Sequence, residues 1–476
     1  MKTPIYTSLV EHAKKGIVSL HVPGHHQGIV FPADAFVTFK DILKIDVTEL
    51  SGLDDLHEPE GIIQEAQQLA SEFFGVQQTY FLVNGSTVGN IAGILSLSQA
   101  GEQVLVQRNC HKSILNGLEL AGAQPIFLEP CLDEELKVAS HVPLTTIEKA
   151  LEQYPEAKAL ILTNPTYYGT SADLTAVVEA AHKKEIPVLV DEAHGAHFAV
   201  GAPFPRSAVE SGADIVVQSA HKTLPAMTMG SYLHYNSVLA DQNKLTRTLA
   251  MLQSSSPSYP IMASLDIARA YLQELRNEDR GRAIEDAVKA FHEELNRIPG
   301  IKTVISNNKE MSHDPLKVSV QSTEGLTGYE LQALFEQAGI YGELSDYANF
   351  LMVLPLAVQN PPYKELLLLE QLLKQYTHKQ AVEQKVEGNA DAIKSLPYSY
   401  DQLKKWSIEV VPAAESIGRI NAQQITPYPP GIPLLMTGEP ISLSHIQQME
   451  KLLAAGAKLQ GSAHIKKGQI AVYQER

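Results

Sequence analysis

Val188-Leu189-Val190-Asp191-Glu192-Ala193-His194 begins with a short apolar run, Val188–Val190, which is followed directly by two acids. This run is one of seven such runs between Gln77 and Tyr235, and amphipathic stretches such as Leu174–Lys184 separate several of them. The other six are Tyr80–Val83, Gln103–Val106, Pro125–Leu128, Ala159–Leu162, Ile215–Val217 and Ser231–His234. Apolar strands that alternate with helices form a mainly parallel sheet covered on both faces. The sequence therefore predicts an α/β domain whose ligands bind at the carboxyl ends of the strands.

The chain has 476 residues, which is too long for one hydrophobic core. Changes in composition predict an N-terminal arm over 1–60, a large domain over 61–300, a small α/β domain over 301–380, a linker over 381–397 and a C-terminal domain over 398–476. We also expect one long helix from Met262 to Arg297 and a strand at Ile340–Tyr341.

The surface charge argues against several classes of partner. The 54 Asp and Glu residues outnumber the 38 Lys and Arg residues, which gives a net charge of −16. Such a surface repels nucleic acid and anionic membranes. The two cysteines indicate a reducing compartment, and the chain has no apolar run of 18 residues and no apolar N-terminal segment. A cytoplasmic location is therefore expected.

Lys222 is the first candidate for chemistry. It stands in Ser219-Ala220-His221-Lys222, directly after the strand that ends near Gln218. A lysine amine at this edge of a sheet can condense with the aldehyde of a cofactor. Most lysines are surface residues, so this interpretation depends on the residues around it.

Asp191 supplies that context. A carboxylate at the end of a strand can keep the ring nitrogen of pyridoxal 5'-phosphate (PLP) protonated, so that the ring accepts electrons. Asp-Glu-Ala-His also occurs in helicases, but those need a phosphate-binding Gly-Lys, and the chain has no Gly-Lys dipeptide. Asp191, His194 and His197 match no standard zinc motif, and we expect no metal.

Three further segments follow predicted strands. Gly85, Ser86 and Thr87 open a helix, where hydroxyls and backbone N–H groups suit a phosphate, although Ser and Thr are also common helix caps. His111 could stack on the cofactor ring or could be a helix-capping or buried histidine. Asn164–Gly169 could bind the cofactor's phenolic oxygen or could form a plain turn.

Taken in order, these segments resemble the ornithine/lysine/arginine decarboxylase family of fold-type I PLP enzymes, in its short bacterial form, over nearly the whole chain. The motifs that carry the resemblance are His21–His25, Gly52–His57, Asn84–Thr87, Arg108–Ser113, Asp191–His197, Ser219–Leu224, Ser255–Tyr259, Ala263–Asp266, Ala413–Glu415 and Tyr428–Pro433. One departure is His26, where the family usually has lysine.

The resemblance implies roles at matching positions. Lys222 would hold PLP as a Schiff base, Asp191 would pair with its ring nitrogen, and His111 would stack on the ring. The implied phosphate ligands are Ser86, Thr87, Ser219 and His221, beside Gly85. Ala193 and His194 would line the same pocket, and Ser255 and Ser256 would reach the site of a neighbouring subunit, which implies a homodimer or a higher oligomer.

The implied reaction is decarboxylation of a basic L-amino acid in polyamine biosynthesis, with arginine favoured, then lysine, then ornithine. Either Lys222 or His111 could return the proton to Cα. A basic substrate needs a carboxylate, for which Glu343, Asp346, Asp54 and Asp55 are candidates, although a solvated or structural acid is the more common role for each. Another fold-type I PLP reaction, or a regulatory protein without catalysis, stays open.

Overall fold

The computed structural model describes residues 2–376, 392–427, 432–454, 456–461 and 464–475. The chain forms two compact units. The first comprises residues 1–97 and 187–281, and the second comprises residues 98–186 and 282–476. The domain limits expected from sequence stay predictions, and residues 381–391 of the expected linker lie outside the described residues.

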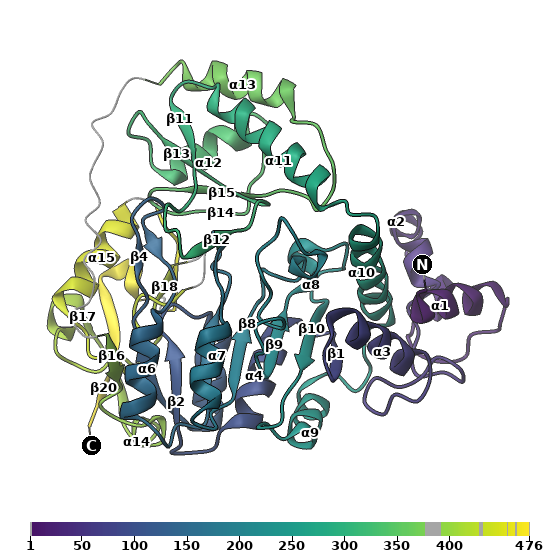
Figure 1. Cartoon of the computed structure of the whole chain (residues 1–476), viewed down its shortest axis with the longest axis horizontal. Helices are drawn as coiled ribbons and strands as arrows, with labels where there is room; N and C mark the ends of the chain where they lie inside the picture. Colours follow the sequence, from purple (N-terminus) through teal and green to yellow (C-terminus); the bar gives the residue numbers. More distant parts are fainter. Residues whose placement is uncertain (1, 377–391, 428–431, 455, 462–463, 476) are drawn as a thin grey trace. The chain divides into compact units, whose positions relative to one another are not determined.

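The first unit contains four neighbouring strands in the order β1-β10-β9-β8 (Figure 1). Strands β8 and β9 are parallel, whereas β10 is antiparallel to both β9 and β1. The strands are β1 (Gln78–Leu82), β8 (Val188–Asp191), β9 (Ile215–Gln218) and β10 (Ser231–Tyr235). Each overlaps an expected apolar run and ends within one residue of its end, because these runs are short, rich in β-branched or aromatic residues and bounded by turn residues.

Helix α4 (Gly85–Leu97) packs closely on this sheet. A Cβ at Gly89 would lie 2.7 Å from Leu82 and 2.9 Å from Val217, and one at Gly93 would lie 2.4 Å from Leu189. Two glycines one turn apart therefore let the helix lie directly on the strand side chains. The other helices of this unit are α1 (Pro4–Lys14), η1 (His26–Gly28), α2 (Ala33–Leu43), α3 (Ile62–Phe74), η2 (Phe198–Val200), α8 (Ala220–Thr223), α9 (Gln242–Leu252) and α10 (Tyr259–Asn277).

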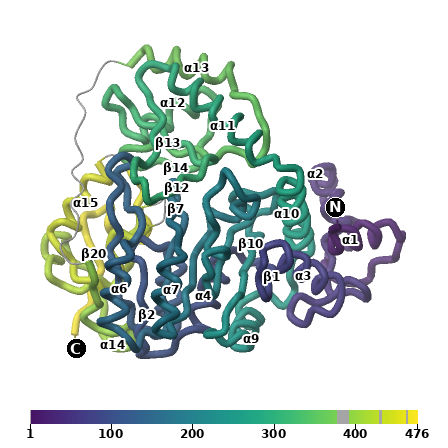
Figure 2. The backbone as a smooth tube through the Cα atoms, in the orientation of Figure 1, coloured from purple at the N-terminus to yellow at the C-terminus, as the bar shows by residue number. Residues whose placement is uncertain are grey.

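A buried ion pair anchors the N-terminal helix. Helix α1 lies beside α3 and contacts α10 (Figure 2). Asp266 and Arg269 of α10 are 3.1 Å apart and almost completely buried. The Asp266 carboxylate also accepts the backbone N–H of Ile5 at 3.0 Å, and Arg269 donates to the carbonyl of Lys2. The pair thus satisfies backbone groups that the start of α1 would otherwise leave unpaired.

The expectation of one helix from Met262 to Arg297 was wrong. Helix α10 ends at Asn277 and α11 (Gly281–Asn296) begins after a turn in which Asp279 has φ +50°. The N–H of Arg280 bonds back to the carbonyl of Leu275 at 3.0 Å, which is a helix-ending arrangement. A Cβ at Gly281 would lie only 2.5 Å from the carbonyl oxygen of Ala202, so glycine is required there.

The second unit contains a sheet in the order β6-β2-β3-β16. Strands β6, β2 and β3 are parallel, which confirms the mainly parallel α/β prediction, and β16 adds antiparallel to the edge of β3. Its elements are β2 (Gln103–Gln107), α5 (Lys112–Ala121), β3 (Gln124–Leu128), β4 (Leu132–Asp133), β5 (Val138–Ala139), α6 (Leu144–Gln153), β6 (Leu160–Thr163), β7 (Thr170–Ala172), α7 (Thr175–His182), β12 (Met311–His313) and β16 (Ile393–Ser395).

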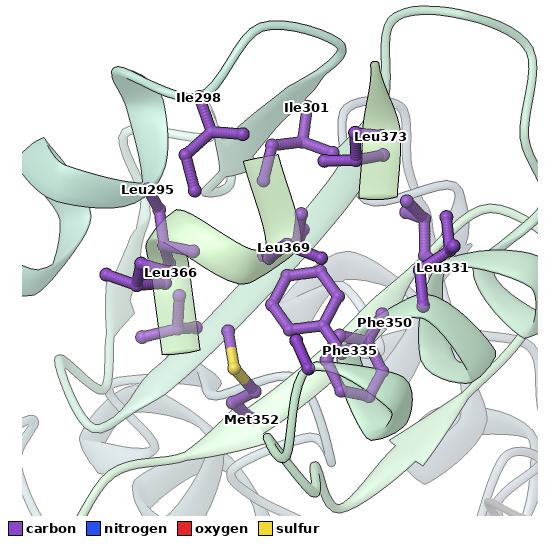
Figure 3. Packing of buried hydrophobic residues seen from close by; sticks show 14 of the residues in the cluster. Leu295, Ile298, Ile301, Leu331, Phe335, Phe350, Met352, Leu366, Leu369 and Leu373 are labelled. Atoms are coloured by element: carbon purple, nitrogen blue, oxygen red, sulfur yellow. The ribbon is translucent and has the colours of Figure 1, made fainter. Parts of the chain in front are cut away.

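The same unit contains an antiparallel sheet in the order β11-β13-β15-β14, covered by helices. Its core includes Phe335 and Phe350, whose ring centroids are 4.6 Å apart, and the leucines around them (Figure 3). Its elements are α11, β11 (Ile301–Val304), β13 (Lys317–Ser322), α12 (Gly328–Gln337), β14 (Leu344–Ser345), β15 (Phe350–Val353) and α13 (Tyr363–Leu373).

The strand expected at Ile340–Tyr341 is absent from this described region, so that expectation was wrong. Gly339 has φ +88°, and the N–H of Ile340 bonds to the carbonyl of Phe335 at 2.8 Å. Ile340 is therefore part of the C-terminal cap of α12, and the strand begins only at Leu344.

The C-terminal residues of the second unit form a small mixed structure with its own apolar cluster, which includes Val411, Ile425, Leu435 and Ile470. Strands β17 and β20 pair antiparallel. The elements are α14 (Tyr400–Leu403), β17 (Ser407–Pro412), η3 (Ala413–Ser416), β18 (Thr426–Pro427), α15 (Leu443–Ala454), β19 (Leu459–Gln460), η4 (Ile465–Lys467) and β20 (Gln469–Gln474). Among the residues that the structure describes, no helix has the length and apolarity needed to span a membrane.

Candidate active site

Asp191 ends β8 and is 3% exposed. Its Oδ2 accepts a hydrogen bond from Nδ2 of Asn90 on α4 at 3.0 Å, and its Oδ1 accepts the backbone N–H of Ala193 at 3.2 Å. Burial raises the pKa of Asp191, while the charge of Lys222 and the bonds from Asn90 and Ala193 act in the opposite direction. A buried carboxylate held by amide donors suits a partner that brings a positive charge.

Lys222 follows β9 by four residues and lies in the short helix α8. Its Nζ is 3.0 Å from Nε2 of His194, which is 4% exposed. Because Lys222 also influences the pKa of Asp191, the amine, the imidazole and the carboxylate form one electrostatic group in the first unit. The structure thus brings together three of the residues that the sequence selected.

Two serines expected to bind phosphate face each other. Ser219 Oγ donates to Ser86 Oγ at 2.7 Å, and Ser86 lies in the first turn of α4. Thr87 follows it and is exposed, and Gly85 has φ +79°. His221 Nδ1 lies 3.2 Å from the carbonyl oxygen of Gly230. Hydroxyls beside the start of a helix offer the donors that a phosphate requires.

These residues fit PLP. The buried carboxylate of Asp191 matches a protonated ring nitrogen, the amine of Lys222 matches an aldehyde, and Ser86 with Ser219 matches a phosphate. All of them belong to the first unit.

A second buried carboxylate was missed by the sequence reasoning. Glu192 is completely buried, and its Oε1 accepts the N–H of Ala208 at 2.6 Å. Its Oε2 accepts Gln218 Nε2 at 2.7 Å and Ser207 Oγ at 2.8 Å. A local signal existed, since two acids stand at the end of β8, but sequence does not show that both are buried.

The contacts of Glu192 continue across three more strands. Gln218 of β9 presents Oε1 to Nε2 of His234 on β10 at 3.0 Å, and His234 Nδ1 lies 3.0 Å from Oγ1 of Thr79 on β1. Burial lowers the pKa of His234 to about 3, so its ring is neutral. An acceptor at Glu192 orients the amide of Gln218, which places the ring proton of His234 on Nε2.

Glu192→Gln should change how stability depends on pH. Burial raises the pKa of Glu192 to about 7, although the bonds from Ala208, Gln218 and Ser207 oppose this. The stability that this group contributes is present below its unfolded pKa of about 4.3 and is lost as pH rises through the folded value. The free energy of unfolding of wild type should therefore fall, relative to the variant, by about 3 kcal/mol between about pH 4 and pH 8.

Urea unfolding of both proteins across this pH range measures the difference. Glu210→Gln is the comparison variant. Glu210 is exposed, and burial rather than its charge is the main cause of the raised pKa of Glu192, so most of the fall should persist in that variant. A difference between wild type and Glu192→Gln that does not change with pH would show that the Glu192 carboxyl does not titrate in the folded protein.

His111 belongs to the second unit and is the N-cap residue of α5. Its Nδ1 accepts the N–H of Ser113 at 3.2 Å and lies 2.8 Å from Ser113 Oγ. This fixes the ring and leaves Nε2 as the protonated nitrogen of the neutral imidazole. The helix-capping interpretation of His111 is thus correct, and its stacking role stays a prediction.

The other expected site residues have varied surroundings. Ser255 and Ser256 are exposed in the loop between α9 and α10. In the turn after β6, Asn164 bonds to Ser171 and to both backbone groups of Ala172, as a plain turn would require.

The four candidate substrate acids differ in their contacts. Asp54 accepts five backbone N–H groups around the start of α3, and these outweigh partial burial and lower its pKa. Asp346 accepts bonds from Tyr168, Ala348 and Asn349. Asp55 caps the N–H of His57, and Glu343 is exposed. These contacts favour structural roles for Asp54 and Asp346.

Two family models and several known proteins match this chain. The family model described as "Orn/Lys/Arg decarboxylase, major domain" matches residues 3–310, and the model for the C-terminal domain of the same family matches residues 374–469. A protein of Bacillus subtilis called YaaO is 48% identical over 100% of this chain and 99% of its own length. An arginine decarboxylase of B. subtilis is 36% identical over 100% of this chain and 98% of its own length.

Among solved structures, the lysine decarboxylase LdcF of Francisella novicida superposes with a TM-score of 0.78 at 19% identity. The match covers 99% of this chain and 81% of that one. The likeness confirms the prediction of a fold-type I PLP enzyme fold.

Proposed function

Because the chain belongs to the Orn/Lys/Arg decarboxylase family, we propose that it removes the α-carboxylate of arginine and releases CO2 and the corresponding amine. Family and fold make it a PLP-dependent decarboxylase of a basic amino acid. Arginine is preferred because a B. subtilis arginine decarboxylase is 36% identical over the full chain; lysine and then ornithine come next. Supply of the amine to polyamine biosynthesis is part of the proposal.

The observation that supports this function best is that buried Asp191 feels the charge of the Lys222 amine, which lies 3.0 Å from His194 Nε2. Lys222 would hold PLP through the aldehyde carbon of the cofactor. When bound, PLP withdraws the electron pair that the departing CO2 leaves on Cα. The negative charge of Asp191 keeps the ring nitrogen protonated, and the bonds from Asn90 and Ala193 hold that carboxylate in position.

Ser86, Thr87, Ser219 and His221 are proposed to bind the phosphate, beside Gly85, and His111 to stack on the ring. Ala193 and His194 would line the same pocket. His194 lies close enough to the Lys222 amine to exchange a proton with it, and this supports Lys222 as the group that returns a proton to Cα. His111 Nε2 is the alternative donor, because its Nδ1 is occupied as an acceptor by the start of α5.

A carboxylate must meet the basic end of the substrate, and Asp55 and Glu343 are the better candidates. Glu343 is exposed and Asp55 accepts the N–H of His57, whereas the oxygens of Asp54 and Asp346 accept several bonds from the protein.

We also propose that the protein is a cytoplasmic homodimer. Exposed apolar side chains gather between residues 17 and 39, where Val18, Leu20, Ile29 and Val37 are 83%, 87%, 77% and 75% exposed. A second copy of the chain is the proposed cover for this surface, and Ser255 and Ser256 are exposed as a contribution to a neighbouring site requires. Analytical ultracentrifugation should give the mass of a dimer.

The proposed reaction is tested by incubating the PLP-loaded protein with arginine, lysine and ornithine separately. Release of CO2 together with agmatine, and faster release from arginine than from the other two, is the expected result. Faster release of cadaverine or of putrescine would mean that lysine or ornithine, respectively, is the preferred substrate. A protein that binds PLP but releases no CO2 from any of the three would contradict decarboxylation.

A further inference from the structure

The C-terminal residues contact the loop that carries His111. This loop joins β2 to α5, and both it and residues 398–476 belong to the second unit. Arg108 donates from Nη1 to the carbonyl of Pro433 at 3.0 Å and from Nη2 to that of Leu434 at 3.2 Å. Nη2 also lies 3.2 and 3.0 Å from the two carboxylate oxygens of Glu439. One guanidinium therefore meets two carbonyls and a carboxylate across more than 300 positions of sequence.

The contact is partly buried and geometrically specific. The side chains of Arg108 and Glu439 are 13% and 19% exposed. Glu439 Oε2 also accepts the N–H of Met436 at 2.9 Å, so the carboxylate closes the turn at 436–439 as well as meeting the guanidinium. A lysine could not reproduce this contact, because its single ammonium cannot present a planar fork.

The loop is held at both ends, with His111 between the fixed points. The N–H of Arg108 bonds to the carbonyl of Leu128 at 2.9 Å, and Asn109 bonds to the carbonyl of Ser140 at 3.1 Å. After the loop, His111 caps α5 through Ser113. Only Cys110 separates Asn109 from His111. Because Arg108 and His111 are so close along the backbone, a displacement of Arg108 should also displace the imidazole of His111.

We propose that Arg108 is a positioning residue. Through it, the segment Pro433–Glu439 holds the loop that carries His111 in the position that stacking of His111 on the cofactor ring requires. This inference rests on the proposed function, since it uses the stacking role of His111. The C-terminal residues then contribute to catalysis without touching the substrate.

The experiment compares Arg108→Met with the wild-type PLP-loaded protein. Arg419→Met is the matched control, because Arg419 also pairs with a glutamate in the C-terminal residues, Glu409, at 2.9 Å, yet this pair does not involve the loop. Trp406 is the single tryptophan of the chain and packs against Tyr398 and Tyr473, so its fluorescence reports whether these residues stay folded. If Arg108→Met unfolds the C-terminal residues, the milder variants Arg108→Lys and Glu439→Gln take its place.

The expected result is a PLP dissociation constant raised about tenfold, with kcat reduced more than KM is changed, while Trp406 fluorescence and the control stay like wild type. In a His111→Ala background, Arg108→Met should cause little further change, because both substitutions act on the same ring.

Two results would overturn the inference. One is wild-type PLP affinity and kcat in Arg108→Met and in the milder variants. The other is an effect of the same size with and without His111, which would mean that Arg108 acts on stability alone. Failure of the proposed function is distinguishable, because the wild-type chain itself would then bind no PLP or release no CO2.

Discussion

Asp191→Asn is expected to lower the rate of decarboxylation by about a thousandfold, while the protein stays folded. Asparagine has nearly the same shape and can keep the bond from the N–H of Ala193. It removes the buried negative charge, however, and with it the force that keeps a proton on the ring nitrogen of PLP. The measurement is kcat with the preferred basic amino acid, together with the absorbance of bound PLP.

The matched control is Asp214→Asn. Asp214 is 1% exposed and accepts the N–H of Val188 at 2.7 Å, so it is a buried carboxylate that bonds to the first residue of β8, the strand that Asp191 ends. Its replacement should reduce stability while leaving the activity of the folded protein intact. Equal losses of kcat in the two variants would mean that Asp191 matters for folding and not for its charge beside the cofactor.

Asp266→Ala should be the most damaging change outside the active site, with a loss of about 3–5 kcal/mol in the free energy of unfolding of the region around α1. The variant would leave the guanidinium of Arg269, which is 1% exposed, without its buried carboxylate. It would also remove the acceptor for the N–H of Ile5 and so loosen the start of α1. Hydrogen exchange of the amides of α1 measures the effect directly.

Glu370→Ala serves as the control, because Glu370 pairs with Lys374 at the surface of α13 and surface pairs contribute little. The exchange of α1 amides should be unchanged in that variant and much faster in Asp266→Ala. Wild-type exchange in Asp266→Ala would show that the ion pair does not hold the helix.

The strands of the site could be predicted because their signal is local. Val188–Val190 and Ile215–Val217 are short apolar runs followed by polar residues, and β8 and β9 cover both of them. The turn between α10 and α11 could not, because the need for glycine at position 281 comes from the carbonyl of Ala202, which is distant in sequence. The helical spacing of apolar residues continues through such a turn, so the sequence pattern does not reveal the break between the two helices.

The site residues also divide into those that a local sequence signal reveals and those whose partners are distant in sequence. Asp191 and Lys222 are recognisable because each ends or follows a strand, and the structure places both in one electrostatic group. Glu192 has the same local signal as Asp191, but its partners Ser207, Gln218 and Ala208 are 15, 26 and 16 residues away. Arg108 is still harder to assign, since its partners lie 325 and more positions along the chain.

Covalent binding of PLP to Lys222 can be measured by reducing the PLP-loaded protein with borohydride, digesting it and locating the modified lysine by mass spectrometry. We expect one pyridoxyl group on Lys222 and none on the other lysines, with loss of the modification in Lys222→Ala. A pyridoxyl group on another lysine, or unmodified Lys222 in a protein that has bound PLP, would show that Lys222 is not the cofactor lysine.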